Sequence, residues 1–326
     1  MLGSWVRSAG TVAVAVAGLC SQAWAGENDL VLPRLAEVTA ARDGVVAKNQ
    51  EFRSLVSELG VALAPKFLSP ADTLGYSGFQ FSSELSFTTI HRTESYWCAT
   101  EETDGCGPSD TKTTAALPTV AVFARKGIWL PLPSFELGAG ALHVLDSRMW
   151  AAQAYAKLAL HEGFHEWPIP SLAVRLAASR LFGSEQLDLT VTSVDVSVSK
   201  SFGILGTVSL EPYAGWNLLW MLPRSQVLDK TPETDPLVDT TDARLNFVFP
   251  EQDPISRQRF FGGFKLKYYV FAITAEVNVA LPGSSLDNRA GSTSCDAAPA
   301  EKQNSCDAKD KAGAQQTYAL SLSLDF

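Results

Sequence analysis

Hydrophobic and polar positions alternate with a period of two along most of this chain, and the alternation is clearest at the C-terminus. Over residues 317–326 every second side chain is apolar, and the residues between them are small or polar. A period of two places the two sets on opposite faces of a β-strand. The apolar set of this last segment is Tyr318, Leu320, Leu322, Leu324 and Phe326.

The same alternation recurs upstream and predicts about ten strands of roughly the 9 to 11 residues that a tilted membrane-spanning strand needs. Near Ser193 the apolar set moves from odd to even positions, which predicts a β-bulge. Residues 244–249 could form one more strand and, with a partner, raise the count to about twelve. The predicted strands occupy residues 79–87, 118–125, 135–144, 150–161, 172–177, 187–200, 208–220, 260–268, 273–279 and 317–326.

The connections between these strands form two groups that alternate along the chain. The short or moderate ones lie near 127–134, 162–168, 201–206 and 270. The other group contains every long connection and lies near 92–116, 146–149, 183–186, 222–257 and 283–315. If both ends of the strand region face the periplasm, all the long connections lie on the outer side, as in bacterial outer-membrane barrels.

Charged residues gather on one face of the predicted strands, whereas the other face carries Phe, Trp and Leu. Lipid offers no hydrogen bonds, so strands cross a bilayer only as a closed barrel, with the apolar face outward. Acidic and basic residues would then pair inside a small lumen. The predicted lumen-lining residues are Glu84, Arg125, Glu136, Lys157, Arg175, Asp188, Asp195, Glu211, Lys265, Lys267, Glu276 and Asp325.

Aromatic residues gather near the ends of the predicted strands. Trp129, Trp150 and Trp220 are examples. Such residues are typical of the interfacial girdles of membrane barrels.

The first 25 residues have the features of a secretory signal peptide. Arg7 supplies a positive charge, residues 11–19 are apolar, and Ala23-Trp24-Ala25 fits a cleavage site. The mature chain is therefore expected to begin at Gly26.

Residues 26–73 differ from the strand region that follows them. Phe52, Leu55, Val56 and Leu59 have helical spacing, and Gly60 is a candidate for the end of the helix. We expect a periplasmic segment whose short helix covers the floor of the barrel; a helix that acts as a functional plug is the alternative.

Composition and charge restrict the class of protein and its partners. Hydrophobic residues make up 46% of the chain, which argues against extensive disorder. The formal net charge is −9, so nucleic acid is not an expected partner. After residue 25 no apolar run approaches the roughly 18 to 20 residues of a membrane-spanning helix.

Four cysteines remain after the predicted signal peptide, in two close pairs within polar segments. An exported chain meets an oxidising compartment, so disulfides are expected. Three connectivities are possible, and we favour two local bonds, Cys98 with Cys106 and Cys295 with Cys306.

The signal peptide and the terminal motif Tyr318-Ala-Leu-Ser-Leu-Ser-Leu-Asp-Phe326 resemble those of bacterial outer-membrane β-barrel proteins. The resemblance implies an all-β, antiparallel up-and-down barrel in the outer membrane of a Gram-negative bacterium. It also implies that lipid, lipopolysaccharide and, through the C-terminal strand, the barrel-assembly machinery are partners. The expected domains are residues 1–25, the signal peptide; 26–73, the periplasmic segment; and 74–326, the barrel.

Two sets of residues suggest chemistry. His161-Glu162-Gly163-Phe164-His165 matches a zinc-protease pattern, which requires a helix that brings both histidines to one face. Gly163 and Pro168 oppose such a helix, and the same residues fit a strand followed by a turn. His91, His143 and Asp146 lie near predicted strand ends, but no nucleophile or acid pair accompanies them at a diagnostic spacing.

The function expected from these features is a narrow or gated channel, or a structural surface protein with disulfide-stapled loops. A barrel of about ten strands is filled by side chains, so we predict low or no conductance. One alternative is a transporter of a small or hydrophobic ligand, and another is a zinc-dependent hydrolase that uses His161, Glu162 and His165. We expect a monomer without enzymatic activity or a cofactor.

Overall fold

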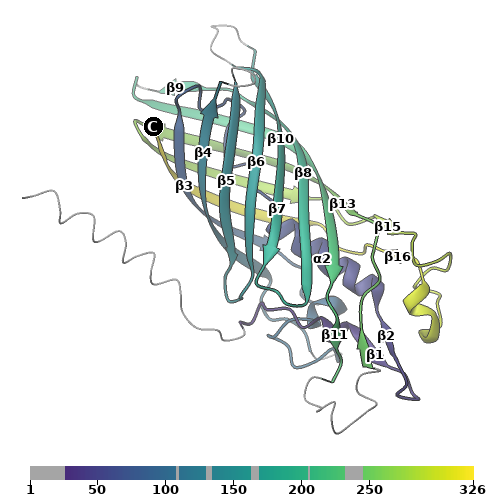
Figure 1. Ribbon diagram of the computed structural model, residues 1–326. Coiled ribbons are helices and arrows are strands. Elements are labelled where there is room, and N and C mark those ends of the chain that lie inside the picture. Colours follow the sequence, from purple (N-terminus) through teal and green to yellow (C-terminus); the bar gives the residue numbers. More distant parts are fainter. Residues whose placement is uncertain (1–25, 108–109, 130–133, 163–168, 205, 232–244) are drawn as a thin grey trace, which may run out of the picture.

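Ten antiparallel strands form a closed barrel in the computed structural model, which describes residues 26–107, 110–129, 134–162, 169–204, 206–231 and 245–326 (Figure 1). Each strand pairs with its neighbours in chain order, and β17 pairs with β3 to close the ring. The predicted up-and-down barrel is confirmed. Its strands are β3 (Phe79–Thr89), β4 (Ala116–Ile128), β5 (Phe135–Val144), β6 (Trp150–His161), β7 (Ser171–Phe182), β8 (Leu187–Ser199), β10 (Val208–Ser225), β13 (Ile255–Tyr268), β14 (Phe271–Ala280) and β17 (Gln315–Asp325).

The other elements are not part of this ring of ten strands. Residue 244 of the possible strand 244–249 lies outside the described residues, and the described part, 245–249, supplies no further barrel strand: within the described residues β12 (Asn246–Phe247) pairs with β11 (Leu228–Asp229) alone. Among the described residues, no helix is long and apolar enough to cross a membrane. The remaining elements are η1 (Leu32–Leu35), β1 (Ala36–Val38), β2 (Val45–Ala47), α2 (Asn49–Leu63), η2 (Ser95–Cys98), β9 (Phe202–Ile204), β15 (Leu286–Asp287), η4 (Ala300–Ser305) and β16 (Ala308–Lys309).

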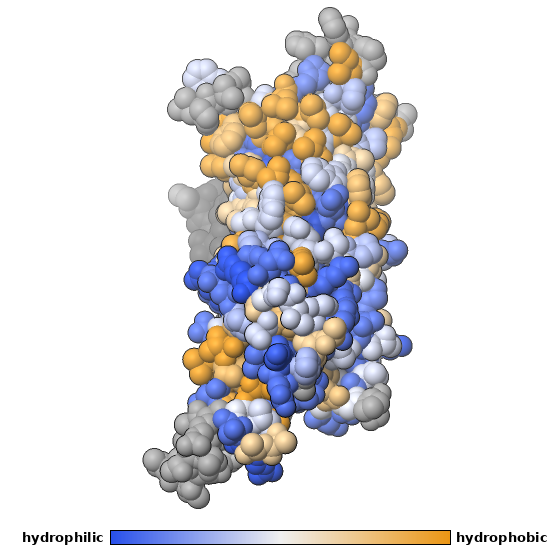
Figure 2. All heavy atoms as spheres, turned by 90° about the vertical axis from the view of Figure 1, so that its right-hand side faces the viewer, coloured by the Kyte–Doolittle hydropathy of each residue, from blue (hydrophilic) through white to orange (hydrophobic). Residues whose placement is uncertain are grey.

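The apolar face of the strands points outward, as the lipid argument requires. Leu176 on β7 is 57% exposed, whereas its neighbour Arg175 is 1% exposed. Leu322 and Ser321 on β17 show the same contrast, at 56% and 1%. Figure 2 shows hydrophobic surface gathered around one half of the molecule and hydrophilic surface over the other half. The hydrophobic half forms a belt for membrane lipid.

The two ends of the barrel differ as the connection lengths predicted. The short turns and Phe326 lie at one end, where the Phe326 amide donates to the Phe79 carbonyl at 2.7 Å. The longer connections meet at the other end. We call these the short-turn end and the long-loop end.

The helix predicted near residues 52–59 exists, but it does not cover the floor of the barrel at the short-turn end. Instead, α2 lies in the lumen toward the long-loop end, and β1 and β2 lie beyond it (Figure 1). Every residue from Phe52 to Leu63 is buried. The helix therefore differs from the expectation in its place within the barrel: side chains that are buried all round need the lumen as their environment.

Gly60 does not end α2, because it serves a close contact instead. A Cβ atom on Gly60 would lie 2.4 Å from Sδ of Met221 on β10. The helix continues for three residues beyond Gly60 and ends before Pro65.

The position of α2 also explains why the predicted β-bulge at Ser193 is absent. The pairing of β8 with β7 and β10 is continuous through this residue. Leu187, Leu189 and Val191 point inward and join the hydrophobic core around α2. The inward face of β8 thus changes from polar to apolar where the lumen contains a helix, and sequence periodicity misread that change as a bulge.

The core at the long-loop end resembles the interior of a soluble protein. Phe52 of α2 stacks on Phe249 with ring centroids 4.2 Å apart, and Leu55 and Leu59 are fully buried. Each such side chain contributes about 2 kcal/mol when it leaves water.

Inward-facing aromatic rings lie over cross-strand glycines in the barrel wall. Tyr213 on β10 is directly opposite Gly263 on β13, and Tyr155 on β6 is opposite Gly138 on β5. A Cβ atom on Gly263 would lie 2.9 Å from the Tyr213 hydroxyl and 2.3 Å from the Ala275 carbonyl oxygen. The missing side chain lets the tyrosine lie close to the wall.

Replacing Gly263 with alanine is expected to lower the free energy of unfolding by about 1–3 kcal/mol, because the added methyl group has no room. Gly203→Ala on β9 is the matched control, since its Cβ would meet nothing within 4 Å. The free energies of unfolding of both variants are measured by urea titration in detergent micelles, with heat-modifiable gel migration as the readout of the folded fraction. Equal stabilities of the two variants would contradict the packing argument.

Candidate functional site: a plugged lumen and its cap

Residues 64–74 continue from α2 through the polar half of the lumen, so we call residues 49–74 the plug. The irregular backbone of residues 64–74 accepts hydrogen bonds from basic side chains of the barrel wall. Arg259 donates to the Pro65 carbonyl at 2.8 Å, and Arg175 donates to the Lys66 carbonyl at 2.8 Å. Lys157 donates to the Asp72 carbonyl at 2.9 Å.

Acidic and hydroxyl groups of the wall accept hydrogen bonds from the plug amides. Glu276 accepts from the amides of Phe67 at 3.2 Å and Leu68 at 2.6 Å. Leu68 itself has a left-handed backbone, with φ at 43°, a conformation that costs free energy for a residue with a side chain. Further along, the Leu74 amide donates to Glu136 at 3.0 Å.

Phe67 anchors the plug in this polar half. Its ring stacks on Phe261 of β13 with centroids 4.9 Å apart, and the Arg175 guanidinium lies 4.5 Å from its centroid on another side. Stacking and cation–π contacts of this kind add about 1 kcal/mol each to the apolar burial. The plug therefore has both a polar and an aromatic attachment to the wall.

Eleven of the twelve predicted lumen residues do lie inside. Glu84 pairs with Arg125 at 2.7 Å, and Glu136 pairs with Lys157 at 3.2 Å. Asp325 pairs with Lys265 at 2.6 Å, and Arg175 also pairs with Asp195. The full set inside is Glu84, Arg125, Glu136, Lys157, Arg175, Asp195, Glu211, Lys265, Lys267, Glu276 and Asp325.

Asp188 is the exception, because it faces the outer surface and pairs there with Arg180. Sequence reading also missed Arg257 and Arg259, which are buried and contact the plug region. Both precede Phe260, where the strand was expected to start. The same alternation extends back to Ile255, and a predicted strand that began there would have included both arginines on its inward face.

A polar cavity of about 340 Å³ remains at the short-turn end. Its inner limit is the plug at Pro70 and Asp72, and its wall includes Lys157, Lys265 and Lys267. The lumen is thus open to solvent at one mouth and filled beyond it.

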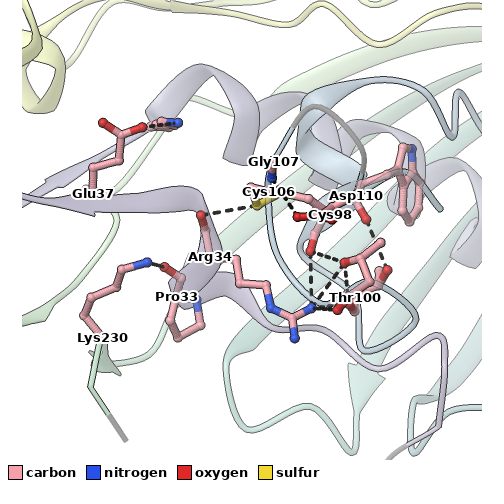
Figure 3. The surroundings of a disulfide bond; sticks show 12 residues. Pro33, Arg34, Glu37, Cys98, Thr100, Cys106, Gly107, Asp110 and Lys230 are labelled. Carbon is pink, nitrogen blue, oxygen red and sulfur yellow. Dashed lines mark hydrogen bonds and ion pairs between the residues drawn. A yellow bond between two sulfur atoms is a disulfide. The ribbon is translucent and has the colours of Figure 1, made fainter.

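The cap at the long-loop end consists of residues 26–48 together with the loops. Arg34 reaches into the loop after β3, where its guanidinium donates to the carbonyls of Thr100 at 2.5 Å and Thr103 at 2.6 Å (Figure 3). The predicted disulfide between Cys98 and Cys106 closes that loop, and the Cys106 sulfur lies 3.5 Å from the Arg34 carbonyl oxygen. The disulfide thereby shapes the loop that holds the N-terminal part of the cap.

The second predicted disulfide, Cys295–Cys306, has a similar place in the loop before β17. Asn304 in this loop accepts a hydrogen bond from the Ala47 amide and donates one to the Val45 carbonyl at 3.0 Å. Both local connectivities are confirmed, and each stapled loop contacts the segment before α2.

Glu58 ties the plug to the cap. This carboxylate on α2 is fully buried and accepts hydrogen bonds from the Tyr96 hydroxyl and the Trp97 indole, both at 2.8 Å. It also accepts from the His91 amide at 3.0 Å and contacts His91 Nδ1 at 2.6 Å. Burial, together with the Glu58 charge, raises the pKa of Tyr96, so the phenol remains a hydrogen-bond donor at neutral pH.

The candidate catalytic residues do not assemble in the described part of the chain. His91 contacts Glu58, whereas His143 stacks on Trp150 with centroids 4.2 Å apart. His161 is the last residue of a strand, so it lacks the helical geometry that the zinc motif requires. Glu162 accepts hydrogen bonds from Thr73 and Ser134, and His165 lies outside the described residues. Those residues contain no cluster suited to a metal ion.

An apolar belt around a closed strand cylinder, with charges inside, defines an outer-membrane β-barrel protein. No family model and no curated protein matches the chain. Its structural neighbours include Neisserial surface protein A, at 8% identity and a TM-score of 0.28, with 76% of this chain and 97% of that chain covered.

Two further neighbours are outer-membrane proteins of named bacteria. For Ail, the attachment invasion locus protein of Yersinia pestis, the values are 10% identity, a TM-score of 0.26, and coverage of 77% and 99%. For in-vitro folded OmpT of Vibrio cholerae they are 9%, 0.25, and coverage of 65% and 56%. TM-scores this low assign the chain to none of these proteins' families.

Replacing Glu58 with glutamine is expected to lower the free energy of unfolding by about 2 kcal/mol or more, because buried donors lose a charged acceptor. Glu94→Gln is the control, since Glu94 is exposed in the same loop; its effect should stay within about 0.5 kcal/mol. Chemical unfolding in lipid vesicles compares the two. A Glu58 variant as stable as the control would show that the plug does not depend on this carboxylate.

Proposed function

We propose that this protein is a sealed outer-membrane anchor that presents a folded cap on the outer surface, not a diffusion pore. One observation carries the proposal: the backbone of the plug is hydrogen bonded to the wall along the polar half of the lumen. Several charges that would line a water-filled pore, among them Lys157, Arg175 and Glu276, are instead engaged with a segment of the same chain.

Opening the lumen would require many of these contacts to break together. Withdrawal of the plug would exchange its hydrogen bonds with Arg175, Arg259 and Glu276 for bonds to water, and would expose the apolar side chains of α2. A hydrogen bond to a charged group contributes about 1.5–3 kcal/mol net, and each exposed large apolar side chain costs about 2 kcal/mol. This combined cost favours a permanently closed barrel and supports a structural role over a gated channel.

The cap offers the surface through which such a protein would act. Arg34 of segment 26–48 donates a hydrogen bond to the first disulfide-closed loop, and Asn304 of the second disulfide-closed loop donates one to segment 26–48. Long, stapled connections on the outer side and short periplasmic turns match the usual orientation of bacterial barrels.

Planar-bilayer recordings test the seal. The wild-type protein should give no large, stable currents, because the plug excludes a continuous water path. A Phe67→Ala, Glu276→Gln variant should give brief small currents, since it loses the aromatic anchor and the charge that holds two plug amides. Lys126→Gln, an exposed change on the outer face of β4, is the control. Large, stable currents from the wild-type protein would refute the proposal.

Cysteine labelling of intact cells tests the orientation. Ala41→Cys lies in the exposed turn between β1 and β2, and Ser77→Cys lies in an exposed turn at the short-turn end. A membrane-impermeant maleimide should label the first variant in intact cells and the second only after the outer membrane is permeabilised. The reverse pattern would place the cap in the periplasm and contradict its presentation outside.

A further inference from the structure

Three arginines form a pocket on the outer surface of the barrel at the long-loop end. Arg180 lies on β7, Arg224 lies on β10, and Arg289 follows β15 in the loop before β17. The pocket has a volume of about 290 Å³, and Leu222, Pro223 and Pro254 add apolar surface to its lining. It is distinct from the cavity inside the lumen, and one of its lining residues, Gln252, also donates to the Asn49 carbonyl of the plug.

The strand alternation fixes this pocket on the lipid-facing side. Arg180 lies on the same face of β7 as Leu176 and Phe182, which are more than half exposed. Arg224 shares the outward face of β10 with Leu222, whereas Met221 points into the core. Arg180 and Arg224 therefore continue the rows of the apolar belt.

The pocket also lies at the edge of that belt. On β10 the outward residues run from Leu218 through Trp220 and Leu222 to Arg224, so apolar side chains give way to a charge. Trp150 is directly opposite Phe182 at the neighbouring strand ends. Aromatic residues followed by arginine mark the level of lipid headgroups. Figure 2 shows the same change from hydrophobic to hydrophilic surface.

The guanidinium groups retain hydrogen-bonding capacity toward the pocket. Arg224 is 74% exposed, and the ion pair that it makes within the described residues is a 3.8 Å contact with Glu251. Arg289 donates to Asp253 at 2.7 Å through Nε, which leaves its terminal nitrogens with a 3.6 Å contact to Glu251. Arg180 is held by Asp188 and by Thr190 at 2.6 Å, with its side chain 48% exposed.

Asp188 and Asp253 hold Arg180 and Arg289 by short contacts, whereas Glu251 is held loosely. Glu251 is 65% exposed, and its contacts with Arg224 and Arg289 are longer than hydrogen bonds. Exposed ion pairs of this kind contribute little, so a phosphate group can displace the carboxylate. Arginine binds phosphate with two parallel hydrogen bonds, an arrangement that suits phosphate better than a carboxylate at this distance.

We infer that this pocket binds the phosphorylated headgroup of a membrane lipid in the leaflet at the long-loop end, with its acyl chains on the neighbouring apolar belt. In the proposed orientation that lipid is the phosphorylated glycolipid of the outer leaflet. The assignment of the leaflet rests on the proposed function, whereas the binding of the phosphorylated lipid does not.

Native mass spectrometry of the full-length protein in detergent tests the site with three probes: bisphosphorylated lipid A, its dephosphorylated form, and inorganic phosphate. The wild-type protein should retain the first and release the other two. The variant Arg180→Gln, Arg224→Gln, Arg289→Gln should bind bisphosphorylated lipid A about tenfold or more weakly, since each basic group near an anionic surface contributes severalfold.

The control variant Arg42→Gln, Lys302→Gln, Lys309→Gln removes the same number of charges from exposed positions of the cap. It should bind like the wild type, and heat-modifiable migration should show that both variants are folded. Equal retention of the dephosphorylated lipid, binding of phosphate alone, or equal losses in the two variants would each overturn the inference. A detergent micelle has no inner and outer leaflet, so the measured binding of bisphosphorylated lipid A does not depend on the orientation of the barrel. Failure of the orientation test would therefore leave the binding result unchanged.

Discussion

The interior of this barrel follows from one constraint: backbone groups withdrawn from water must find hydrogen-bond partners within the protein. The ten strands satisfy one another around the ring, and α2 satisfies its own backbone. Residues 64–74 form neither a strand nor a helix, so their backbone groups lack both kinds of regular hydrogen bonding. Their carbonyls and amides are met by side chains of the wall, among them Arg175, Arg259 and Glu276. Part of the lumen charge, which suggests a polar pore when only the barrel is considered, therefore serves as the partner of an irregular segment.

The same constraint explains why the two halves of the lumen differ in composition. A helix presents side chains rather than backbone groups to its surroundings, so the wall beside α2 is apolar, with Leu187, Leu189 and Val191 on β8. The irregular segment presents backbone groups, and the same strand continues with Ser193, Asp195 and Ser197 on its inward face. Each half of the wall thus matches the kind of chain that it encloses. A segment that supplied its own hydrogen bonds would have required no charged wall.

Plug and cap form one structural unit rather than two attachments to a barrel. Glu58 joins α2 to the loop after β3, and the hydrophobic core extends from α2 into the loops and into residues 30–35. The two disulfides close loops that contact the segment before α2. Rigidity at the long-loop end and closure of the lumen consequently have a common origin. This arrangement suits a protein that presents a defined surface, and the arginine pocket below the cap would fix that surface relative to the lipid.

The sequence by itself determined the barrel, because alternation and strand length are local properties imposed by lipid on one side and polar groups on the other. It also determined the two local disulfides and the inward position of residues such as Arg175 and Glu276. Only the tertiary structure decided what fills the lumen. The helical spacing of Phe52, Leu55 and Leu59 shows that a helix forms, but not which surface buries it, since that depends on the diameter of the closed ring and on the side chains facing its axis. Asp188 was misplaced for the same reason: its strand changes inward composition beside α2, and only the register with Arg180 and Leu222 shows that this carboxylate lies outside.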